Sequence, residues 1–283
     1  MPKVAIVTDS TADLPREYLE KYNITVVPLS VIFEENAYTD NGIDITKDEF
    51  YIKLKIAKKL PTTAQPTPAD FLSVYKKLLK DHESIISIHI SKKMSGTPDS
   101  AEAARKELGS NDITVIDSEM TTVALGLIIL KAALLAAEDK PKEEILKAAN
   151  DLKSKINALF IPRTLEYLQK GGRIGRAKGL IASLLEIKPV LTLRLGEVSQ
   201  YKTTRRWNQA KNELINSMQG MISGTGNLIV SLADADLKEE GDEMYSRIRE
   251  LLKPGFLLRT TVGCIVGTHL GPGLAIAFYE EQF

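Results

Sequence analysis

The sequence has one cysteine, no excess of either charge and no long hydrophobic run. Cys264 alone can form neither an intrachain disulfide nor a zinc site built from cysteines, which argues against a disulfide-stabilised secreted domain. The 37 Lys and Arg residues balance the 37 Asp and Glu residues, so the chain has no net positive field that would attract nucleic acid. We therefore predict that no nucleic acid is a partner.

Features of membrane-bound and exported proteins are also missing. The most apolar segment, Val123 to Ala137, contains Lys131 and is shorter than the about 20 residues that a membrane-spanning helix needs. It predicts a buried helix and no stable membrane insertion. The N-terminus passes from Met1 directly into a short apolar run, without the charged region, long apolar stretch and cleavage site of a signal peptide. We expect a cytoplasmic protein.

Familiar catalytic signatures are absent as well. There is no Gly-x-Gly-x-x-Gly motif after the first apolar run, no phosphate-binding loop, no Gly-x-Ser-x-Gly elbow and no His-Glu-x-x-His. These absences argue against a self-contained nucleotide enzyme, and we assign no catalytic residue, metal ligand or cofactor to this chain. Ser95, His269 and Asp9 leave a hydrolase triad open, because triads are defined by geometry that a sequence does not supply.

The 283 residues are enough for two domains of about 150 residues each. We predict the domains to be 1–155 and 156–283. In the first domain, short β-branched runs alternate with amphipathic stretches, which predicts an α/β fold with a doubly wound, mostly parallel sheet. The predicted strands are Val4–Thr8, Thr25–Ile32, Ile85–Ile90 and Ile113–Ile116, and the predicted helices are Pro15–Tyr22, Lys47–Lys59, Pro68–Leu79, Asp99–Leu108 and Met120–Glu138.

The second half mixes hairpins with helices, which predicts an α+β domain. It follows a charged helix at about Lys142–Lys155. The predicted strands are Pro189–Leu193, Val198–Lys202, Leu228–Leu232, Val262–Val266 and Leu274–Phe278, and the predicted helices are Leu165–Lys170, Gly179–Leu185, Arg206–Met221 and Leu237–Leu252.

Small polar residues follow the predicted strands of the first domain. They are Ser10 after the first strand, Thr62 and Thr63 before a helix, and Ser95 with Gly96 after the third strand. Ligands of open α/β sheets bind at the carboxyl ends of the strands, where helix N-termini favour anions. The pattern predicts a site for an anionic head group. Other residues of these loops are interpreted as helix caps: Asp13, Thr67 and Thr97.

Two later segments add possible cationic partners. Arg173 and Arg176 stand among glycines, which allow close approach of the backbone and leave the guanidinium groups free for a carboxylate or phosphate. His269 lies in a glycine-proline turn, where a core-filling role is hard to supply. His82 and His89 are interpreted as structural.

Five segments of the chain closely resemble the DegV family, and they occur in the family's order over nearly the whole chain. They are Val4–Thr11, Thr63–Phe71, Ile88–Thr97, Tyr167–Gly175 and Gly267–Gly273. The resemblance implies a two-domain α/β protein that holds one long-chain fatty acid in a tunnel between its domains. It further implies the lipid-carrying subunit of a bacterial fatty acid kinase. Such a subunit presents the carboxylate to a separate subunit, which carries ATP and magnesium, for conversion to acyl phosphate.

The resemblance also suggests roles for individual residues. Thr63 and Ser95 correspond to the carboxylate-binding hydroxyls, with Arg173 and His269 nearby from the second domain, and we add Thr62, Ser10 and Gly96 as further ligand-binding candidates. The chain departs from the family at two positions. Ala64 replaces a serine that is common in the family, so Thr62 or a water would have to substitute for the missing hydroxyl. Pro98 replaces a common aromatic residue at the expected tunnel mouth. Candidate tunnel walls are Ala124–Ala136 and Leu180–Leu185.

Two alternatives from other classes stay open beside the kinase subunit. One is a lipid carrier that has no kinase partner, and the other is a Ser/His hydrolase acting on acyl esters. The sequence decides neither the preferred chain length and saturation nor the oligomeric state.

Overall fold

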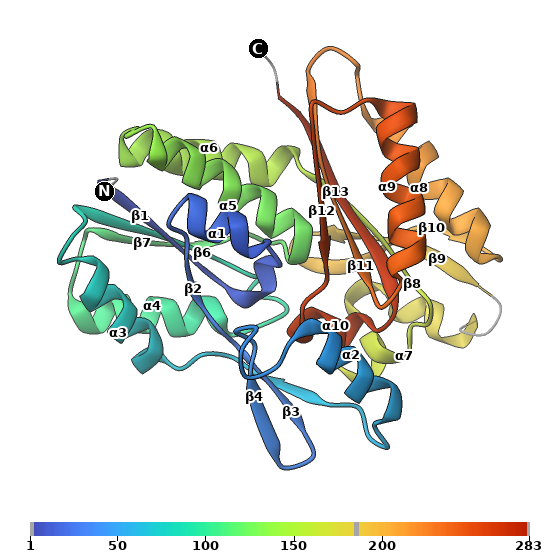
Figure 1. Cartoon of the computed structure of the whole chain (residues 1–283), viewed down its shortest axis with the longest axis horizontal. Coiled ribbons are helices and arrows are strands. Elements are labelled where there is room, and N and C mark those ends of the chain that lie inside the picture. Colours follow the sequence, from blue (N-terminus) through green and yellow to red (C-terminus); the bar gives the residue numbers. More distant parts are fainter. Residues whose placement is uncertain (1–2, 184–186, 282–283) are drawn as a thin grey trace.

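The computed structural model describes residues 3–183 and 187–281. Within them the chain forms a parallel-sheet domain and a mixed-sheet domain that lie side by side (Figure 1). The predicted combination of a parallel sheet with a separate α+β unit is confirmed. No helix in the described ranges has both the length and the apolar composition needed to cross a bilayer.

The sheet of the first domain is fully parallel, with the strand order β2-β1-β6-β7. Every residue of β1 and β6 is buried, as is typical of a parallel sheet covered on both faces. The connection from β1 leads to β2 on one side, and the next strand of the sheet, β6, lies on the other side of β1. The carboxyl ends of β1 and β6 therefore form a switch point suited to a ligand. The strands are β1 (Val4–Asp9), β2 (Thr25–Val27), β6 (Ser84–His89) and β7 (Ile113–Asp117).

Helices cover both faces of this sheet. Val7 of β1 packs with Phe71 and Ala101 of the helices on one face, whereas its neighbour Ile6 packs with Leu125 on the other face. This alternation follows from the two-residue period of a strand. The helices are α1 (Arg16–Lys21), α3 (Pro68–Leu78), α4 (Thr97–Leu108), α5 (Thr122–Ala137) and α6 (Lys142–Lys155).

A small antiparallel sheet, β4-β3-β5, extends from the first domain. It consists of β3 (Ser30–Phe33), β4 (Asn36–Thr39) and β5 (Thr62–Ala64), and α2 (Lys47–Ile56) lies between β4 and β5 in the chain. The single predicted strand Thr25–Ile32 is therefore wrong. It is broken at Pro28, which has no N–H to continue a sheet ladder.

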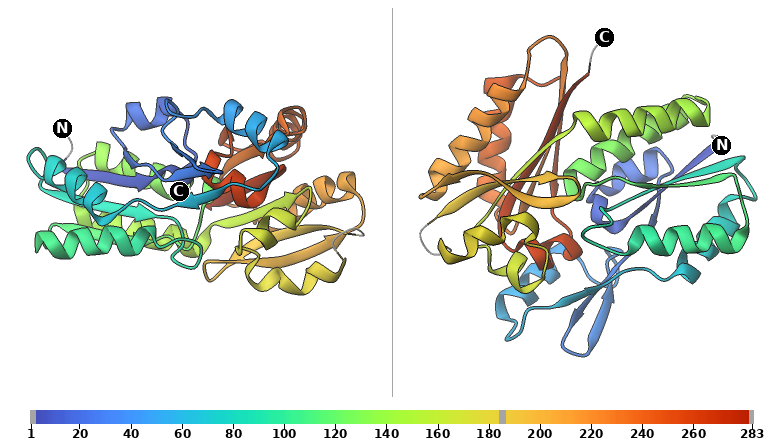
Figure 2. Two further views of the ribbon diagram at one scale, coloured as in Figure 1. Left: turned by 90° about the horizontal axis from the view of Figure 1, so that it is seen from below. Right: turned by 180° about the vertical axis from the view of Figure 1, so that it is seen from behind.

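The mixed-sheet domain has six strands in the order β10-β9-β8-β13-β11-β12. The pairings are antiparallel except for β11 with β12. Helices α8 (Trp207–Met221) and α9 (Lys238–Leu252) cover one face, and the other face turns toward α5 (Figure 2). The strands are β8 (Asn157–Pro162), β9 (Lys188–Arg194), β10 (Glu197–Thr204), β11 (Asn227–Ala235), β12 (Phe256–Thr261) and β13 (Gly273–Glu281).

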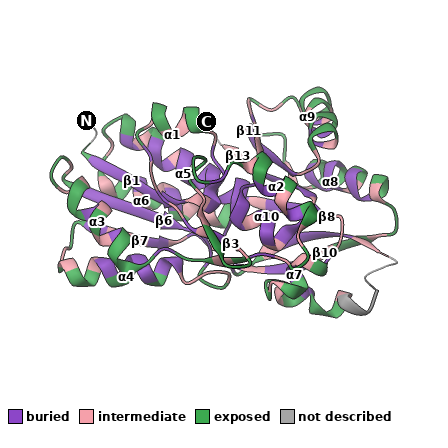
Figure 3. Cartoon of the chain, turned by 60° about the horizontal axis from the view of Figure 1, so that its bottom comes forward, coloured by how far each residue is buried: buried purple, intermediate pink, exposed green. Residues whose placement is uncertain are grey.

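One apolar core continues from the first sheet to the second. Helix α5 contacts β1 on one side and β13 on the other, so Ile6, Leu125 and Ala275 belong to the same buried cluster. Figure 3 shows β1, β6 and α5 as largely buried. Because α6 ends at Lys155 and β8 begins at Asn157, the two domains follow each other without a long connection.

Other sequence predictions need correction. The predicted strand Val262–Val266 is wrong, because β12 ends at Thr261 and the helix α10 (Cys264–Leu270) begins after Gly263. A short apolar run has no periodicity that separates the two structures. The predicted helix Gly179–Leu185 is replaced by a 3₁₀ segment, η2 (Gly175–Ser183), and its last two residues lie outside the described residues.

Two of the predicted helix caps are also misplaced. Asp13 has a left-handed backbone with φ of 51° and ends the 3₁₀ turn η1 (Ser10–Ala12), so it does not cap α1. Gly96, rather than Thr97, precedes the first residue of α4. The third prediction is confirmed, because Thr67 and Asp70 form a complete capping box at the start of α3.

Candidate functional site

A narrow cavity lies between the two sheets. Its volume is about 130 Å³. Both domains line it, and most of the lining is apolar. The apolar lining residues are Leu29, Ile90, Met94, Val123, Ala124, Ala158, Leu159, Phe160, Leu168, Leu193, Val198, Ile265, Val266, Leu270, Ala275 and Ile276.

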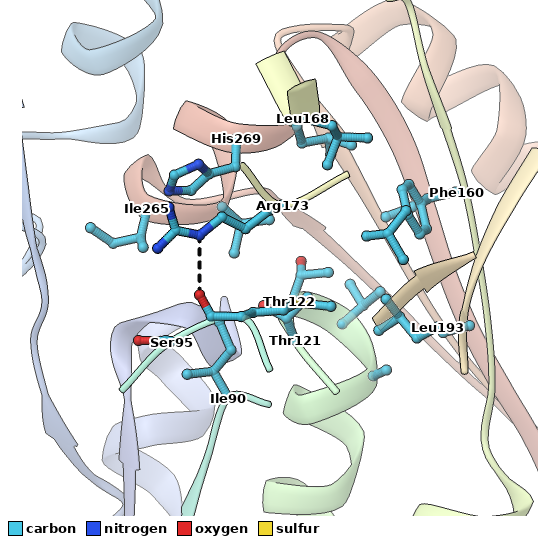
Figure 4. Close-up of a pocket in the computed structure, with 18 of the residues that line it drawn as sticks. Ile90, Ser95, Thr121, Thr122, Phe160, Leu168, Arg173, Leu193, Ile265 and His269 are labelled. Atoms are coloured by element: carbon cyan, nitrogen blue, oxygen red, sulfur yellow. Dashed lines mark hydrogen bonds between the residues drawn. The ribbon is translucent and has the colours of Figure 1, made fainter. Parts of the chain in front are cut away.

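Polar side chains gather at one side of this cavity. Figure 4 shows Ser95, Arg173 and His269 on that side, with Phe160 and Leu193 on the other. Thr63 lines the cavity as well. These four polar residues come from β5, the loop after β6, the loop after α7 (Glu166–Lys170) and the last turn of α10. The structure thus brings together the four residues that the sequence analysis put first.

Hydrogen bonds, two of them across the domain boundary, hold the polar groups in place. Thr63 Oγ1 lies 2.9 Å from His269 Nε2. Arg173 donates through Nε to the carbonyl oxygen of Met94 at 3.1 Å, the dashed line of Figure 4, and through Nη1 to the carbonyl oxygen of Gly171 at 2.7 Å. Ser95 Oγ lies 2.9 Å from the hydroxyl of Thr97. The two domains are therefore joined at the head of the cavity.

The electrostatic character of this end is positive. Burial lowers the pKa of His269 to about 4, and the charge of Arg173 adds to the effect. His269 is therefore neutral at pH 7, while the Arg173 guanidinium stays charged. One fixed cation, one neutral imidazole and two hydroxyls favour an anionic ligand group that accepts hydrogen bonds.

Gly171 allows the His269 ring to lie where it does. A Cβ atom on Gly171 would lie 2.3 Å from His269 Nδ1, which is far inside contact distance. Nδ1 is buried and has no hydrogen-bond partner in the described part of the chain. Gly171 therefore acts by letting the backbone approach the imidazole closely. The expectation that the glycines leave the Arg173 guanidinium free is wrong, because Arg173 donates to the carbonyl oxygens of Met94 and Gly171.

Three of the predicted ligand residues do not line the cavity. Ser10 Oγ accepts a hydrogen bond from the Leu29 amide at 3.2 Å and borders a different hollow. Thr62 is exposed on β5, where alternation turns its side chain away from that of its neighbour Thr63. Gly96 packs against the amide group of Gln65, where a Cβ would lie 2.3 Å from Oε1.

The two departures from the family pattern also lie outside the lining. Ala64 is exposed on β5, on the same face as Thr62, so neither residue supplies a hydroxyl to the cavity. Pro98 is buried in the first turn of α4. Of the predicted tunnel wall Ala124–Ala136, only Ala124 lines the cavity, and the rest of that helix is mostly core. In the second predicted wall, Leu180–Leu185, Leu180 is not among the lining residues.

Sequence reasoning missed Thr121 and Thr122, which line the cavity at the start of α5. Their hydroxyls are buried without a hydrogen-bond partner within residues 3–183 and 187–281. A signal for them existed in the sequence, because they follow the fourth predicted strand, Ile113–Ile116.

The geometry does not support the hydrolase triad that the sequence left open. Asp9 pairs with His89, not with His269: Asp9 Oδ2 lies 2.9 Å from His89 Nδ1, and both side chains have 0% exposure. His89 Nε2 lies 2.6 Å from Ser87 Oγ, which continues a buried polar network. His89 is thus a structural residue, and His82 contacts the Leu78 carbonyl at the end of α3.

No group of three or more His, Cys, Asp or Glu side chains is arranged to hold a metal ion in the described ranges. The polar end of the cavity itself holds one histidine and no carboxylate. Its chemistry is that of anion binding.

Comparisons with known proteins agree over the whole chain. A model of the DegV family, described as uncharacterised proteins, matches residues 3–281. A DegV domain-containing protein of Caldanaerobacter subterraneus is 37% identical over 282 residues, which cover 100% of both proteins. Protein DegV of Bacillus subtilis is 32% identical over 271 residues, which are 95% of this chain and 96% of that protein.

Solved structures share the fold. A DegV family protein from Thermus thermophilus, described for its fatty acid binding, superposes with a TM-score of 0.91 at 31% identity, covering 99% of this chain and 100% of that one. DegV of Bacillus subtilis, described as a fatty acid binding protein, gives the same score, identity and coverage. A stearic acid-binding protein from Eubacterium ventriosum gives 0.89 at 29% identity, with 99% and 98% covered. By sequence, by fold and over its full described length, the chain belongs to the DegV family.

Proposed function

We propose that this protein binds one long-chain fatty acid in the cavity between its two sheets. The observation that carries the proposal is the asymmetry of the cavity, whose lining is mostly apolar, with Thr121 and Thr122 at the start of α5, and one side of which carries Thr63, Ser95, Arg173 and His269. A fatty acid has the same asymmetry. Structurally similar DegV proteins described as fatty acid binding support the assignment.

Head and tail contribute differently to such binding. Burial of about 14 methylene groups at about 0.8 kcal/mol each gives roughly 11 kcal/mol of gross driving force. A charge-assisted hydrogen bond contributes about 1.5–3 kcal/mol. The chain of the ligand therefore supplies most of the affinity, and the polar groups fix where its carboxylate lies.

The carboxylate would be ionised at pH 7 and would lie beside Arg173. When His269 carries its proton on Nε2, it donates to Thr63 Oγ1, and the Thr63 hydroxyl hydrogen is free for the ligand. Ser95 offers a second hydroxyl at the same end of the cavity. Two O–H donors and one guanidinium then compensate the buried negative charge.

We further propose that the bound carboxylate is presented to a separate kinase subunit that carries ATP and magnesium. Thr63 and Ser95 would hold one carboxylate oxygen, and the other would attack the terminal phosphorus of ATP in line with the leaving group. A carboxyl O–P bond forms and the bond to ADP breaks, which yields acyl phosphate. The lack of nucleotide-binding motifs in this chain supports a division of labour between two proteins.

Mass spectrometry of freshly purified protein under native conditions tests fatty acid binding. We expect one fatty acid per chain, released on denaturation and identified after extraction. An Ala124→Phe variant narrows the cavity and should lose the ligand, whereas Gly220→Ala, in α8, should keep it. Protein that carries no fatty acid and takes up none when palmitate is added would refute the proposal.

Phosphoryl transfer tests the kinase role, with a purified kinase subunit, ATP and fatty acid-loaded protein. Ser95→Ala should retain much of the lipid but slow acyl phosphate formation, because it removes an orienting hydroxyl. Unchanged turnover would remove that role. Fatty acid binding without ATP-dependent turnover would instead favour a lipid carrier, and release of acid from a simple ester would favour a hydrolase.

A further inference from the structure

A second set of contacts joins the domains, away from the head of the cavity. It links the N-terminal half of the chain to residues 260–263, directly before α10. Two of the donors lie on α2 and two on the 260–263 segment itself. The hydrogen bonds, from donor to acceptor, are Lys47 Nζ to Thr261 O (2.5 Å), Tyr51 Oη to Val262 O (3.0 Å), Thr260 Oγ1 to Asp13 O (2.8 Å) and Gly263 N to Asp13 Oδ1 (2.8 Å).

We call these four contacts the joint, and Asp13 is at its centre because it accepts two of the four hydrogen bonds. Its side chain is buried, and Oδ2 has no hydrogen-bond partner among the described residues. Oδ1 accepts from the amide before α10, while Thr122 at the start of α5 lies against the carboxyl group. Neither helix receives a hydrogen bond from the side chain of its own N-cap residue. Oδ1 of Asp13 therefore binds the backbone amide of Gly263, the N-cap residue of α10, from the other domain, and its carboxyl group lies beside the start of α5.

The neighbours of Asp13 carry few charges. Asp40 and Lys47 face it from the loop after β4 and from α2, and Tyr51 and Cys264 lie close by. Burial raises the pKa values of Tyr51 and Cys264, so both stay neutral at pH 7. The joint thus holds two carboxyl groups against one ammonium group. Burial, opposed in part by Lys47, raises the pKa of Asp13 to about 7.

We propose that Asp13 is a positioning residue whose carboxyl group fastens α10 to the parallel-sheet domain, and that this joint opens when the ligand enters or leaves the cavity. The inference rests on the proposed function, because it concerns fatty acid exchange. The cavity is narrow and lined from both domains, so a separation of the domains at α10 would widen the path for an alkyl chain. α10 connects the joint to the head site, since Gly263 precedes it and His269 lies in its last turn, about 10 Å away along a helix of this length.

Opening of the joint is then coupled to proton release. Water that reaches Asp13 in the open form returns its pKa toward the ordinary value of 3.8. The closed joint therefore binds the proton more tightly than the open one, so rising pH favours opening. For closed and open pKa values of about 7 and about 4, the open population rises about tenfold between pH 6 and pH 8.

Two measurements test the joint. In ligand-free protein, hydrogen–deuterium exchange of residues 260–270, corrected for the intrinsic pH dependence, should lose about tenfold in protection between pH 6 and pH 8. In protein loaded with a fluorescent fatty acid, dissociation into phosphatidylcholine vesicles should accelerate by the same factor, while the dissociation constant stays the same within about twofold. Asp13→Asn should remove the pH dependence of both the protection and the dissociation rate. The exposed control Asp81→Asn should keep both pH dependences.

A pH-independent protection of residues 260–270 in the natural protein would overturn the inference, and so would a slope that survives in Asp13→Asn. The profile of the natural protein suffices if that variant does not fold. Failure of the proposed function has a different signature, because a protein that binds no fatty acid would still show the pH-dependent protection if the joint works as inferred.

Discussion

At the polar side of the cavity, the role of Gly171 depends on how closely its backbone approaches the His269 ring. The missing side chain of Gly171 is what leaves space for the ring. The sequence analysis found Arg173 and His269 as isolated polar residues in glycine-rich turns. It had no means of predicting that the glycine of one turn packs against the histidine of the other.

Gly171→Ala should weaken fatty acid binding at least about tenfold, or about 1.4 kcal/mol. The new methyl group would meet Nδ1 of His269 and move the ring from its contact with Thr63. Titration with a fluorescent fatty acid measures the change. Gly220→Ala is the matched control: no atom lies within 4 Å of its added Cβ, so affinity should stay constant while the helix gains about 0.5–1 kcal/mol. Equal affinities of the two variants would contradict the role given to Gly171.

A buried histidine in the parallel-sheet domain matters for stability alone. His89→Ala should lower the free energy of unfolding by about 2–5 kcal/mol, because it leaves a buried cavity and removes hydrogen bonds to Asp9 and Ser87. Asp9 keeps donors from Thr11 and Ile90 in this variant. Chemical denaturation measures this loss. His82→Ala, which removes one contact at the end of α3, should cost about 1 kcal/mol. Similar losses in both variants would show that the Asp9–His89 pair contributes little.

At the scale of elements, the sequence was most informative where the hydrophobic pattern was long and regular. The continuous apolar runs of β1 and β6 predicted the parallel sheet, because strands covered on both faces need no polar side. Short segments were less predictable. β5 has three residues and α10 has seven, so neither spans two full periods of its structure, yet they carry Thr63 and His269.

Element geometry also explains why Ser10 and Thr62 do not line the cavity. Both follow the rule that small polar residues gather near strand ends. Position on the strand face then decides which side chain reaches the cavity, and Thr63 does where Thr62 does not. That face depends on the register of β5 with β3, which pairs residues about 30 apart in the chain.

Two threonines of the same segment have different roles: Thr63 lines the cavity, whereas Thr67 caps α3. Thr67→Ala should cost about 1 kcal/mol of stability, because it removes the capping box of α3, and should leave fatty acid affinity unchanged. Thr63→Val should do the reverse and weaken ligand binding with little change in stability. Thermal melts and ligand titrations of both variants give the comparison. A loss of affinity in Thr67→Ala would mean that the cap also positions the site.

At the scale of the whole molecule, pH acts through two buried groups with opposite signs. The folded protein raises the pKa of Asp13 to about 7, so it binds this proton more tightly than the unfolded chain, and stability falls as pH rises from about 4 to about 7. His269, whose pKa is lowered to about 4, makes stability rise with pH between about 4 and its ordinary value of 6.5. The two slopes oppose each other below pH 6.5.

Asp13→Asn isolates the first of these effects. Relative to the natural protein, the variant should be more stable at pH 8 than at pH 5, and the difference should level off above pH 7. Urea denaturation at several pH values measures it. A difference that is the same at every pH would show that Asp13 keeps an ordinary pKa in the folded protein.

The shared core has a consequence for the chain as a unit. If the backbone were cut between α6 and β8, one fragment would expose the apolar side of α5 and the other would expose Ala158, Phe160 and Ala275. Neither fragment could bury that surface by itself. Two co-expressed fragments should therefore reassociate, because association removes the apolar surface from water. Each half of the molecule thus completes the apolar core of the other, and the cavity between them is enclosed by both halves.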